Sequence, residues 1–460
     1  MTVYLAEYCW LGGEVARDVR IEVRDGLFTA IGPVLPGTRL GEGGIRLPGL
    51  VLPGLANAHS HAFHRALRGR THGERGSFWT WRDLMYRVAE ALTPDKYLEL
   101  ARATFAEMAL SGITAVGEFH YLHHNPDGTP YADPNAMGHA LIEAAREAGI
   151  RITLLDTLYL QSDVDGKPLE GVQRRFGDGD PQRWASRVAE LAAAPHARIG
   201  AAIHSVRAVA AHHLSELGGP RPLHVHLSEQ PAENERCRAV HGRTPAELLD
   251  HHGVLGPHTT AVHATHLTDH DVRLLGGSGT GICMCPTTER DLADGIGRAR
   301  DLADAGSPLS LGSDSHAVID LIEEARALEM NERLATLRRG RFPVAELIAA
   351  AANHASIGWA DAGEIAVGKR ADLVAVALDS VRTAGADPAG AILAATAADV
   401  TDVVVDGRHV VADGRHTAID VPRALAKALA SAEVPASSGA PTSGEAPISG
   451  EAPASSEAVR

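Results

Sequence analysis

The chain of 460 residues has little aromatic content, few cysteines and no long apolar run. Phe, Trp and Tyr together make up only 4% of it. Its four cysteines form neither a CxxC pair nor a regular framework, which argues against a cysteine zinc site and a disulfide scaffold. No apolar run approaches the roughly 18 residues of a membrane span, and the N-terminus lacks a basic segment followed by an apolar one. We therefore expect a soluble, cytoplasmic protein with reduced thiols and no membrane partner.

Positive charge is also scarce, because 43 Lys and Arg face 58 Asp and Glu, which leaves a formal net charge of -15. Such a balance makes nucleic acid a poor candidate partner. The hydrophobic content of 45% is ordinary for a globular core, and the length allows one large domain with a smaller companion. What the chain has in excess is histidine, with 25 residues. The positions of these histidines in the sequence therefore have to indicate what they do.

Apolar, strand-like segments alternate with helix-like segments through the middle of the chain. The helix-like segment 318–337, for example, follows the last strand-like segment. Eight strands across roughly 300 residues are typical of a parallel (β/α)8 barrel. We therefore predict an α/β fold, with a TIM-type catalytic barrel over residues 53–362. The first predicted strand ends at Asn57, and the others are 114–118, 152–155, 199–204, 223–227, 261–263, 281–284 and 309–314.

Short β-rich segments lie near both chain ends. Apolar and polar residues alternate over 19–23, a turn follows at Asp25-Gly26, and 371–376 and 403–407 have the same character. We expect residues 1–52 and 363–425 to form one small β-sandwich domain. From 431 to 460 the composition changes to Ala, Ser, Pro, Gly and Glu, which predicts a disordered tail without a role in chemistry.

Histidines and a carboxylate recur at the ends of the predicted strands. His59 and His61 form a His-x-His pair, and residues i and i+2 of a strand point to the same side. His226 ends a second pair that begins at His224, and Asp314 closes the last strand. Barrel enzymes assemble their sites at the C-terminal ends of the strands. We predict that His59, His61, His226 and Asp314 bind one divalent metal ion, with Zn²⁺ favoured over Fe²⁺ or Mn²⁺.

This ligand set predicts hydrolytic chemistry. A metal ion at these residues would lower the pKa of a water in the remaining coordination position, and Asp314 would be near enough to take its proton. Glu229 follows His226 by three residues and can shuttle a proton to a leaving group. His263 can stabilise the attacking water or a tetrahedral intermediate. Singly, these residues also fit a surface glutamate and a core histidine, but their strand-end positions favour the functional interpretation.

The complete pattern resembles the amidohydrolase superfamily. The resemblance covers nearly the whole chain except the tail, and it implies a metal-bearing barrel joined to a small β-sandwich from both chain ends. It rests on Gly54-Leu55-Ala56-Asn57-Ala58-His59-Ser60-His61, on His226, His263 and Ser313-Asp314, and on the late segment from Gly363 to Leu373.

Within the superfamily, segments 57–63, 77–82, 117–121, 204–207 and 226–230 resemble the formimidoylglutamate deiminase family of histidine degradation. The resemblance implies that the glutamate part of a small dianionic substrate is held by Arg82, Tyr121, His204 and Arg207. Forked guanidinium donors suit such a ligand. Where the family pattern usually carries Gln after Ala-Phe, this chain has His64, so the contact of His64 with substrate is open.

Two other functions remain open at this point. The same metal chemistry fits a deaminase of a cyclic substrate, such as a guanine, cytosine, adenosine-type or triazine compound, which carries no pair of carboxylates. A catalytically silent barrel with a binding role is the other, and the joint presence of six candidate site residues argues against it. A homodimer is common among relatives and is the expected protein partner.

Overall fold

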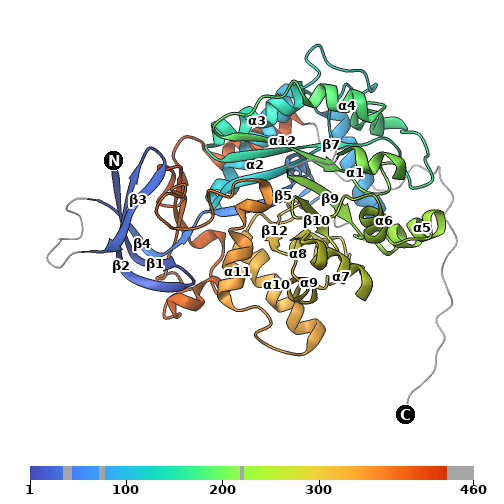
Figure 1. The fold of residues 1–460 in the computed structure, drawn as a ribbon. Helices are drawn as coiled ribbons and strands as arrows, with labels where there is room; N and C mark the ends of the chain where they lie inside the picture. Colours follow the sequence, from blue (N-terminus) through green and yellow to red (C-terminus); the bar gives the residue numbers. More distant parts are fainter. Residues whose placement is uncertain (35–43, 72–77, 218–221, 433–460) are drawn as a thin grey trace.

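The computed structural model describes residues 1–34, 44–71, 78–217 and 222–432, without the side chains of 78–80 (Figure 1). It consists of a closed eight-stranded barrel and a separate eight-stranded sheet built from both chain ends. The predicted fold class is therefore confirmed.

Eight parallel strands close the barrel in chain order, and all eight predicted strands are present. The seam is short, since β12 pairs with β5 only through Leu311 and Asn57. Residues on both faces of the barrel strands are mostly buried, which explains why these strands are near-continuous apolar runs in the sequence. The strands are β5 (Leu55–Ser60), β6 (Ile113–His120), β7 (Arg151–Leu158), β8 (Ala197–Ile203), β9 (Leu223–Leu227), β10 (Thr259–His263), β11 (Gly281–Met284) and β12 (Leu309–Leu311).

Helices cover the outside of the barrel (Figure 1). Their starts carry the expected signals: in α2, Pro94 follows Thr93, whose side chain accepts the N–H of Lys96. The predicted helix at 318–337 is α10. The helices are α1 (Phe78–Ala91), α2 (Pro94–Leu110), α3 (Ala136–Ala148), α4 (Pro181–Val188), α5 (Pro231–His241), α6 (Pro245–His251), α7 (Asp269–Ser278), α8 (Pro286–Asp291), α9 (Ala299–Ala305), α10 (Leu321–Thr336), α11 (Val344–Ala351) and α12 (Val421–Ser431).

The second sheet has the order β16-β15-β14-β13-β4-β1-β2-β3. Its β2–β3 hairpin turns at Asp25 and Gly26, whose φ values of 52° and 79° suit a tight hairpin turn. Tyr4, Ile21 and Val51 belong to its own buried core. The strands are β1 (Thr2–Leu11), β2 (Glu14–Arg24), β3 (Leu27–Pro33), β4 (Ile45–Pro53), β13 (Leu373–Val376), β14 (Val400–Val405), β15 (Arg408–Ala412) and β16 (Arg415–His416).

The chain passes from this sheet into the barrel at Gly54. The apolar run before the first histidine pair is therefore two strands, because β4 ends at Pro53 and β5 begins at Leu55. A Cβ on Gly54 would lie 2.5 Å from Thr114 Oγ1 and 2.7 Å from Asp372 Cβ, so a side chain does not fit at this crossing. The glycine lets the two parts approach closely.

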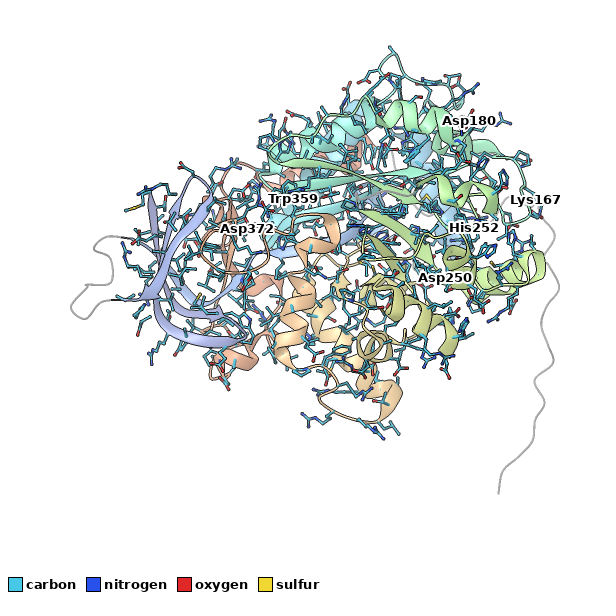
Figure 2. All side chains as sticks on the ribbon, in the orientation of Figure 1. Lys167, Asp180, Asp250, His252, Trp359 and Asp372 are labelled. Carbon is cyan, nitrogen blue, oxygen red and sulfur yellow. The ribbon has the colours of Figure 1, made fainter. Side chains whose placement is uncertain are left out.

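Charged groups join the two parts at the N-terminal end of the barrel. Arg151, at the start of β7, donates to the carboxylates of Asp372 and Asp406, and its guanidinium stacks on Trp359. Figure 2 shows Trp359 and Asp372 at this junction. The domain limits at 52, 362 and 425 are still predictions.

The helix α12 near the end of the described chain was not predicted from the sequence. It contacts α2, and Lys427 Nζ lies 2.8 Å from Glu99 Oε1. Of the proposed tail at 431–460, residues 433–460 lie outside the described part. None of the helices in the described ranges is both long and apolar enough to cross a membrane.

Candidate metal centre and active site

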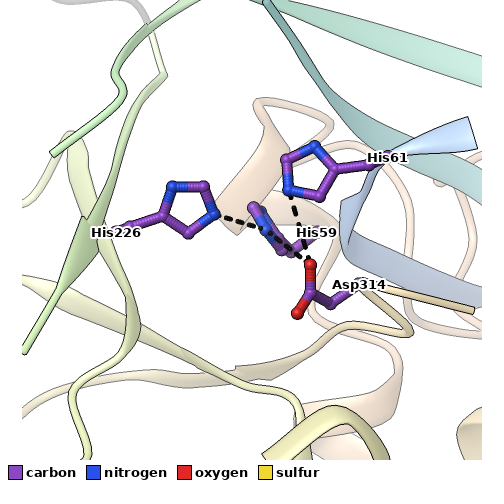
Figure 3. Close-up of side chains that lie close together, drawn as sticks. All are labelled: His59, His61, His226 and Asp314. Carbon is purple, nitrogen blue, oxygen red and sulfur yellow. Dashed lines mark hydrogen bonds and ion pairs between the residues drawn. The ribbon is translucent and has the colours of Figure 1, made fainter. Parts of the chain in front are cut away.

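Four of the predicted site residues converge at the C-terminal end of the barrel (Figure 3). Asp314 Oδ1 lies 3.3 Å from His59 Nε2 and 3.4 Å from His61 Nε2. His226 Nε2, from the β9 strand, lies 3.1 Å from His59 Nε2. One ligand atom from each of the four residues lies within 4.8 Å of the others, and all four residues are buried.

Backbone carbonyls fix the orientation of two of these imidazoles. His61 Nδ1 lies 2.9 Å from the carbonyl oxygen of Phe119, and His226 Nδ1 lies 2.9 Å from that of His204. A carbonyl can only accept, so each Nδ1 carries the hydrogen and each Nε2 presents a lone pair to the centre.

The protonation states of these four side chains suit the binding of a cation. Burial lowers the pKa of His59 to about 3, and it also lowers the pKa values of His61 and His226, so the three imidazoles are neutral. Burial opposes ionisation of Asp314, but the neighbouring histidines hold its pKa well below the usual range. Neutral nitrogen lone pairs that meet a carboxylate in a buried space are a suitable donor set for a divalent metal ion.

The backbone is unusual at the same strand ends. Several residues there adopt left-handed φ values that L-residues rarely show, and such strain often marks functional sites. The values are 50° at Ser228, 67° at His263, 50° at Ala264, 40° at Asp314 and 59° at His316.

His263 and Glu229 stand beside the cluster. His263 Nε2 lies 3.9 Å from Glu229 Oε1 and 3.7 Å from Asp314 Oδ2. Burial alone would lower the pKa of His263, but the carboxylates of Glu229, Glu289 and Asp314 raise it well above its ordinary value. A cationic imidazole in this place can stabilise negative charge that develops above the cluster.

A cavity opens above the cluster. Phe176, Tyr159 and Leu292 give it apolar walls. His59 lies below it and is fully buried. The other ten predicted site residues line it: His61, His64, Arg82, Tyr121, His204, Arg207, His226, Glu229, His263 and Asp314.

The residues predicted to hold substrate lie in the wall of this cavity. Arg207 Nε lies 3.3 Å from Glu233 Oε2, and its Nη2 lies 3.8 Å from Glu229 Oε2. The Arg82 guanidinium lies 5.5 Å from the centre of the Tyr86 ring, so it has an aromatic support.

His64 and Tyr121 act as a pair in the same wall, since His64 Nε2 lies 3.0 Å from the Tyr121 hydroxyl. His204 Nδ1 lies 3.3 Å from Ser205 Oγ, and its ring packs on that of Tyr159. The wall therefore offers two guanidinium groups and a hydroxyl to an anionic ligand.

Two buried carboxylates at the site were missed from the sequence. Glu118 accepts the Ala62 N–H and the Ser60 hydroxyl, both at 2.6 Å, and burial raises its pKa to about 8. Glu289 Oε1 lies 3.5 Å from His263 Nδ1. Glu118 ends the predicted strand 114–118, and Glu289 lies in α8, shortly after β11, so the position near a strand end was the available signal.

A second cluster with metal-like spacing is formed by His120, His123 and Asp156. Both oxygens of Asp156 already accept from the Arg187 guanidinium, at 2.9 and 2.8 Å, and Trp184 Nε1 donates to one of them at 2.9 Å. A guanidinium that neutralises the carboxylate leaves little attraction for a second cation.

A closed parallel barrel with three histidines and an aspartate at its C-terminal end defines a metal-dependent hydrolase of the TIM-barrel class. Residues 50–410 match the family model described as the amidohydrolase family, and the chain belongs to that family.

Curated relatives cover most of the chain. It is 37% identical over 393 residues to a formimidoylglutamate deiminase of Pseudomonas aeruginosa, across 81% of this chain and 86% of the relative. It is 33% identical over 406 residues to an 8-oxoguanine deaminase of the same species, across 83% and 87%. Among solved structures, an amidohydrolase from Brucella melitensis superposes with a TM-score of 0.85 at 32% identity, across 94% of this chain and all of that one.

Proposed function

We propose that the protein catalyses hydrolytic deimination of N-formimidoyl-L-glutamate in histidine degradation, in which water and substrate give N-formyl-L-glutamate and ammonia. One observation carries the proposal: a single cavity joins the His59, His61, His226 and Asp314 cluster to Arg82 and Arg207. The similarity to a formimidoylglutamate deiminase agrees with it.

Substrate binding follows from the cavity wall. Arg82 and Arg207 bind the carboxylates of the glutamate part, and Tyr121 and His204 add polar contacts beside them. His64 acts through Tyr121, whose hydroxyl it holds. The formimidoyl group then lies toward the metal cluster.

Proton transfer is assigned to residues next to that group. Zn²⁺ is proposed as the bound ion, and when bound it lowers the pKa of a coordinated water. Asp314 takes the proton of the attacking water, and Glu229 delivers a proton to the departing nitrogen. Ammonia can then leave in place of a poor amide-ion leaving group. His263 stabilises the negative charge of the addition step.

A deaminase of a cyclic substrate is the second candidate, and the similarity to an 8-oxoguanine deaminase favours it. The two candidates differ in what they require of the wall. A purine-like ring carries no pair of carboxylates, so Arg82 and Arg207 would contribute little to its binding.

A substrate panel tests the proposal. The purified, metal-loaded protein is assayed for ammonia release from formimidoylglutamate, guanine, 8-oxoguanine, cytosine and adenosine. We expect release from formimidoylglutamate alone. Release from a ring compound and none from formimidoylglutamate would replace this proposal with the second candidate.

Arginine variants test the carboxylate contacts. We expect Arg82→Met and Arg207→Met to raise KM for formimidoylglutamate by about 10- to 100-fold each, since a hydrogen bond to a charged group contributes about 1.5–3 kcal/mol. Arg207→Met should also lower kcat, because Arg207 lies beside Glu229. Arg298→Met is the matched control, because Arg298 pairs with Asp269 and Asp301 away from the cavity. Unchanged KM in both test variants would refute the assignment.

A further inference from the structure

The short segment 285–289, which leads from β11 into helix α8, supplies none of the proposed ligands or proton carriers, yet it lies against His263 and bonds to Ser315 beside Asp314. The Cys285 N–H donates to Glu289 Oε1 at 2.9 Å, and the same oxygen lies 3.5 Å from His263 Nδ1. Glu289 and His263 are each only 1% exposed. A buried carboxylate therefore stands directly behind the ring of His263.

The two ring nitrogens of His263 face opposite surroundings. Nδ1 faces Glu289, whereas Nε2 faces Glu229 at 3.9 Å and Asp314 at 3.7 Å. A carboxylate accepts a hydrogen and never donates one when ionised, so it orients Nδ1–H toward itself. This orientation is the same for a neutral and for a protonated ring, and it leaves Nε2 directed at the reaction centre.

We propose that Glu289 is a positioning residue that holds His263 through Nδ1, so that Nε2 is directed toward Glu229, Asp314 and the reacting group. His263 is the last residue of β10 and has a left-handed φ of 67°, so the regular strand ends at this residue. The orientation of its ring therefore needs a restraint from a neighbouring side chain. The carboxylate behind the ring supplies that restraint, as buried partners of functional histidines generally do.

The residues next to Glu289 in the segment 285–289 are themselves held by hydrogen bonds. Thr287 donates its N–H to Glu324 of α10 at 2.9 Å, and its hydroxyl also donates to that carboxylate. Thr288 Oγ1 accepts the Ser315 N–H at 3.2 Å, next to Asp314. The segment thus ties His263 and the loop that carries Asp314 to one framework, which keeps their separation constant.

The test compares Glu289→Gln and Glu289→Ala with wild type, and it relies on the proposed function only for the choice of substrate. We expect kcat for ammonia release to fall by about 10- to 100-fold in Glu289→Ala, as for other residues that orient functional histidines. KM should stay within about 2-fold and the metal content should remain one ion per chain, because Glu289 contacts neither the carboxylate-binding wall nor a ligand nitrogen. Glu289→Gln keeps an acceptor oxygen and should recover part of kcat.

Glu329→Gln is the matched control, because Glu329 is also 1% exposed but bonds to Arg333 and to backbone N–H groups of 340 and 342. It should keep wild-type kcat. Wild-type kcat in Glu289→Ala, or a kcat loss that merely follows loss of metal, would overturn the proposal. If Glu289→Ala does not fold, an unchanged kcat in folded Glu289→Gln together with unaltered KM would overturn it as well.

If the proposed function is wrong, the wild-type protein itself releases no ammonia from formimidoylglutamate. That result is seen before any variant is compared, so it differs from a failure of the Glu289 proposal. The Glu289 comparison is then made with whichever substrate of the panel the wild type converts.

Discussion

At the scale of single residues, the two oxygens of Asp314 face different groups, which suits the two tasks proposed for it. Oδ1 faces His59 and His61, whereas Oδ2 faces His263 at 3.7 Å. The first oxygen is placed to bind a cation, and the second is placed to exchange a proton with the reaction centre. In the proposed mechanism, one carboxylate therefore couples metal binding to proton transfer.

Replacing this carboxylate by an amide should remove both tasks. We expect Asp314→Asn to lower kcat by at least about 10³-fold, in the range of a lost general base, and to reduce the bound metal. Metal analysis of the purified variant, together with the ammonia assay, measures the two effects. A variant that binds one metal ion and keeps more than a tenth of wild-type kcat would contradict the assignment.

Spacing along the chain explains which site residues could be predicted. His59, His61, His226 and Asp314 each lie at a strand end, and the structure brings all four together. Glu118 and Glu289 could not be given a role in the same way, because they act on a backbone N–H and on the rear of a histidine ring. Those contacts depend on how neighbouring strands pack, which a local pattern does not contain.

At the scale of elements, the eight barrel strands were predictable because each is a short buried run followed by polar residues. The predicted domain limit between 52 and 53 falls inside the run 50–55, but composition does not mark the break itself, which is a change of pairing partner at Gly54 between β4 and β5. A related close approach occurs in the loop after β12, where a Cβ on Gly312 would lie 2.7 Å from His59 Cβ.

Glu118 of β6 holds the end of β5, where the first histidine pair lies. It accepts from Ser60 and Ala62, the two residues that flank His61. We expect Glu118→Ala to weaken metal binding by about 10- to 100-fold, because both oxygens that accept from Ser60 and Ala62 are lost. Competition with a chelator of known affinity measures the change. KM of the fully loaded variant should not change, and an unaltered metal affinity would show that the end of β5 does not need this support.

At the scale of the whole molecule, the site and the second sheet lie at opposite ends of the barrel. The junction depends on Arg151, which is 1% exposed and is shared between Asp372 and Asp406. Burial alone would lower the pKa of Arg151, but the two carboxylates raise it, so the guanidinium stays charged. The junction is therefore a buried ionic contact with further polar partners around Asp372 and Asp406.

Removing the cation alone should destabilise the protein strongly. We expect Arg151→Met to lower the free energy of unfolding by about 3–5 kcal/mol, because Asp372 is left buried without its partner. Urea unfolding of wild type and variant measures the difference. The double variant Arg151→Met/Asp372→Asn should recover part of the loss. Equal stability of the single and double variants would show that the uncompensated charge is not the cause.

The same junction contains a histidine that makes stability depend on pH. His354 is 1% exposed, its Nδ1 lies 2.9 Å from the Ala352 carbonyl oxygen, and its Nε2 lies 3.0 Å from Thr114 Oγ1. Burial, followed by the positive charge of Arg151, lowers its pKa from 6.5 to about 4. Between these two pH values the unfolded chain binds the proton and the folded chain does not.

Stability should therefore be complete above pH 6.5 and should decrease as the pH falls toward 4. The shift from 6.5 to about 4 corresponds to about 3 kcal/mol, at about 1.36 kcal/mol for each pH unit of the shift. His354→Asn keeps a donor for the Ala352 carbonyl but does not titrate, so its free energy of unfolding should fall less between pH 7.5 and pH 4.5 than that of wild type. Urea unfolding at both pH values gives the two differences. Because both proteins keep the same metal site and the other buried histidines, such as His123, those contributions cancel in the comparison. Equal losses in the two proteins would show that His354 is not the group that titrates, and a larger loss in the variant would reverse the sign argued here.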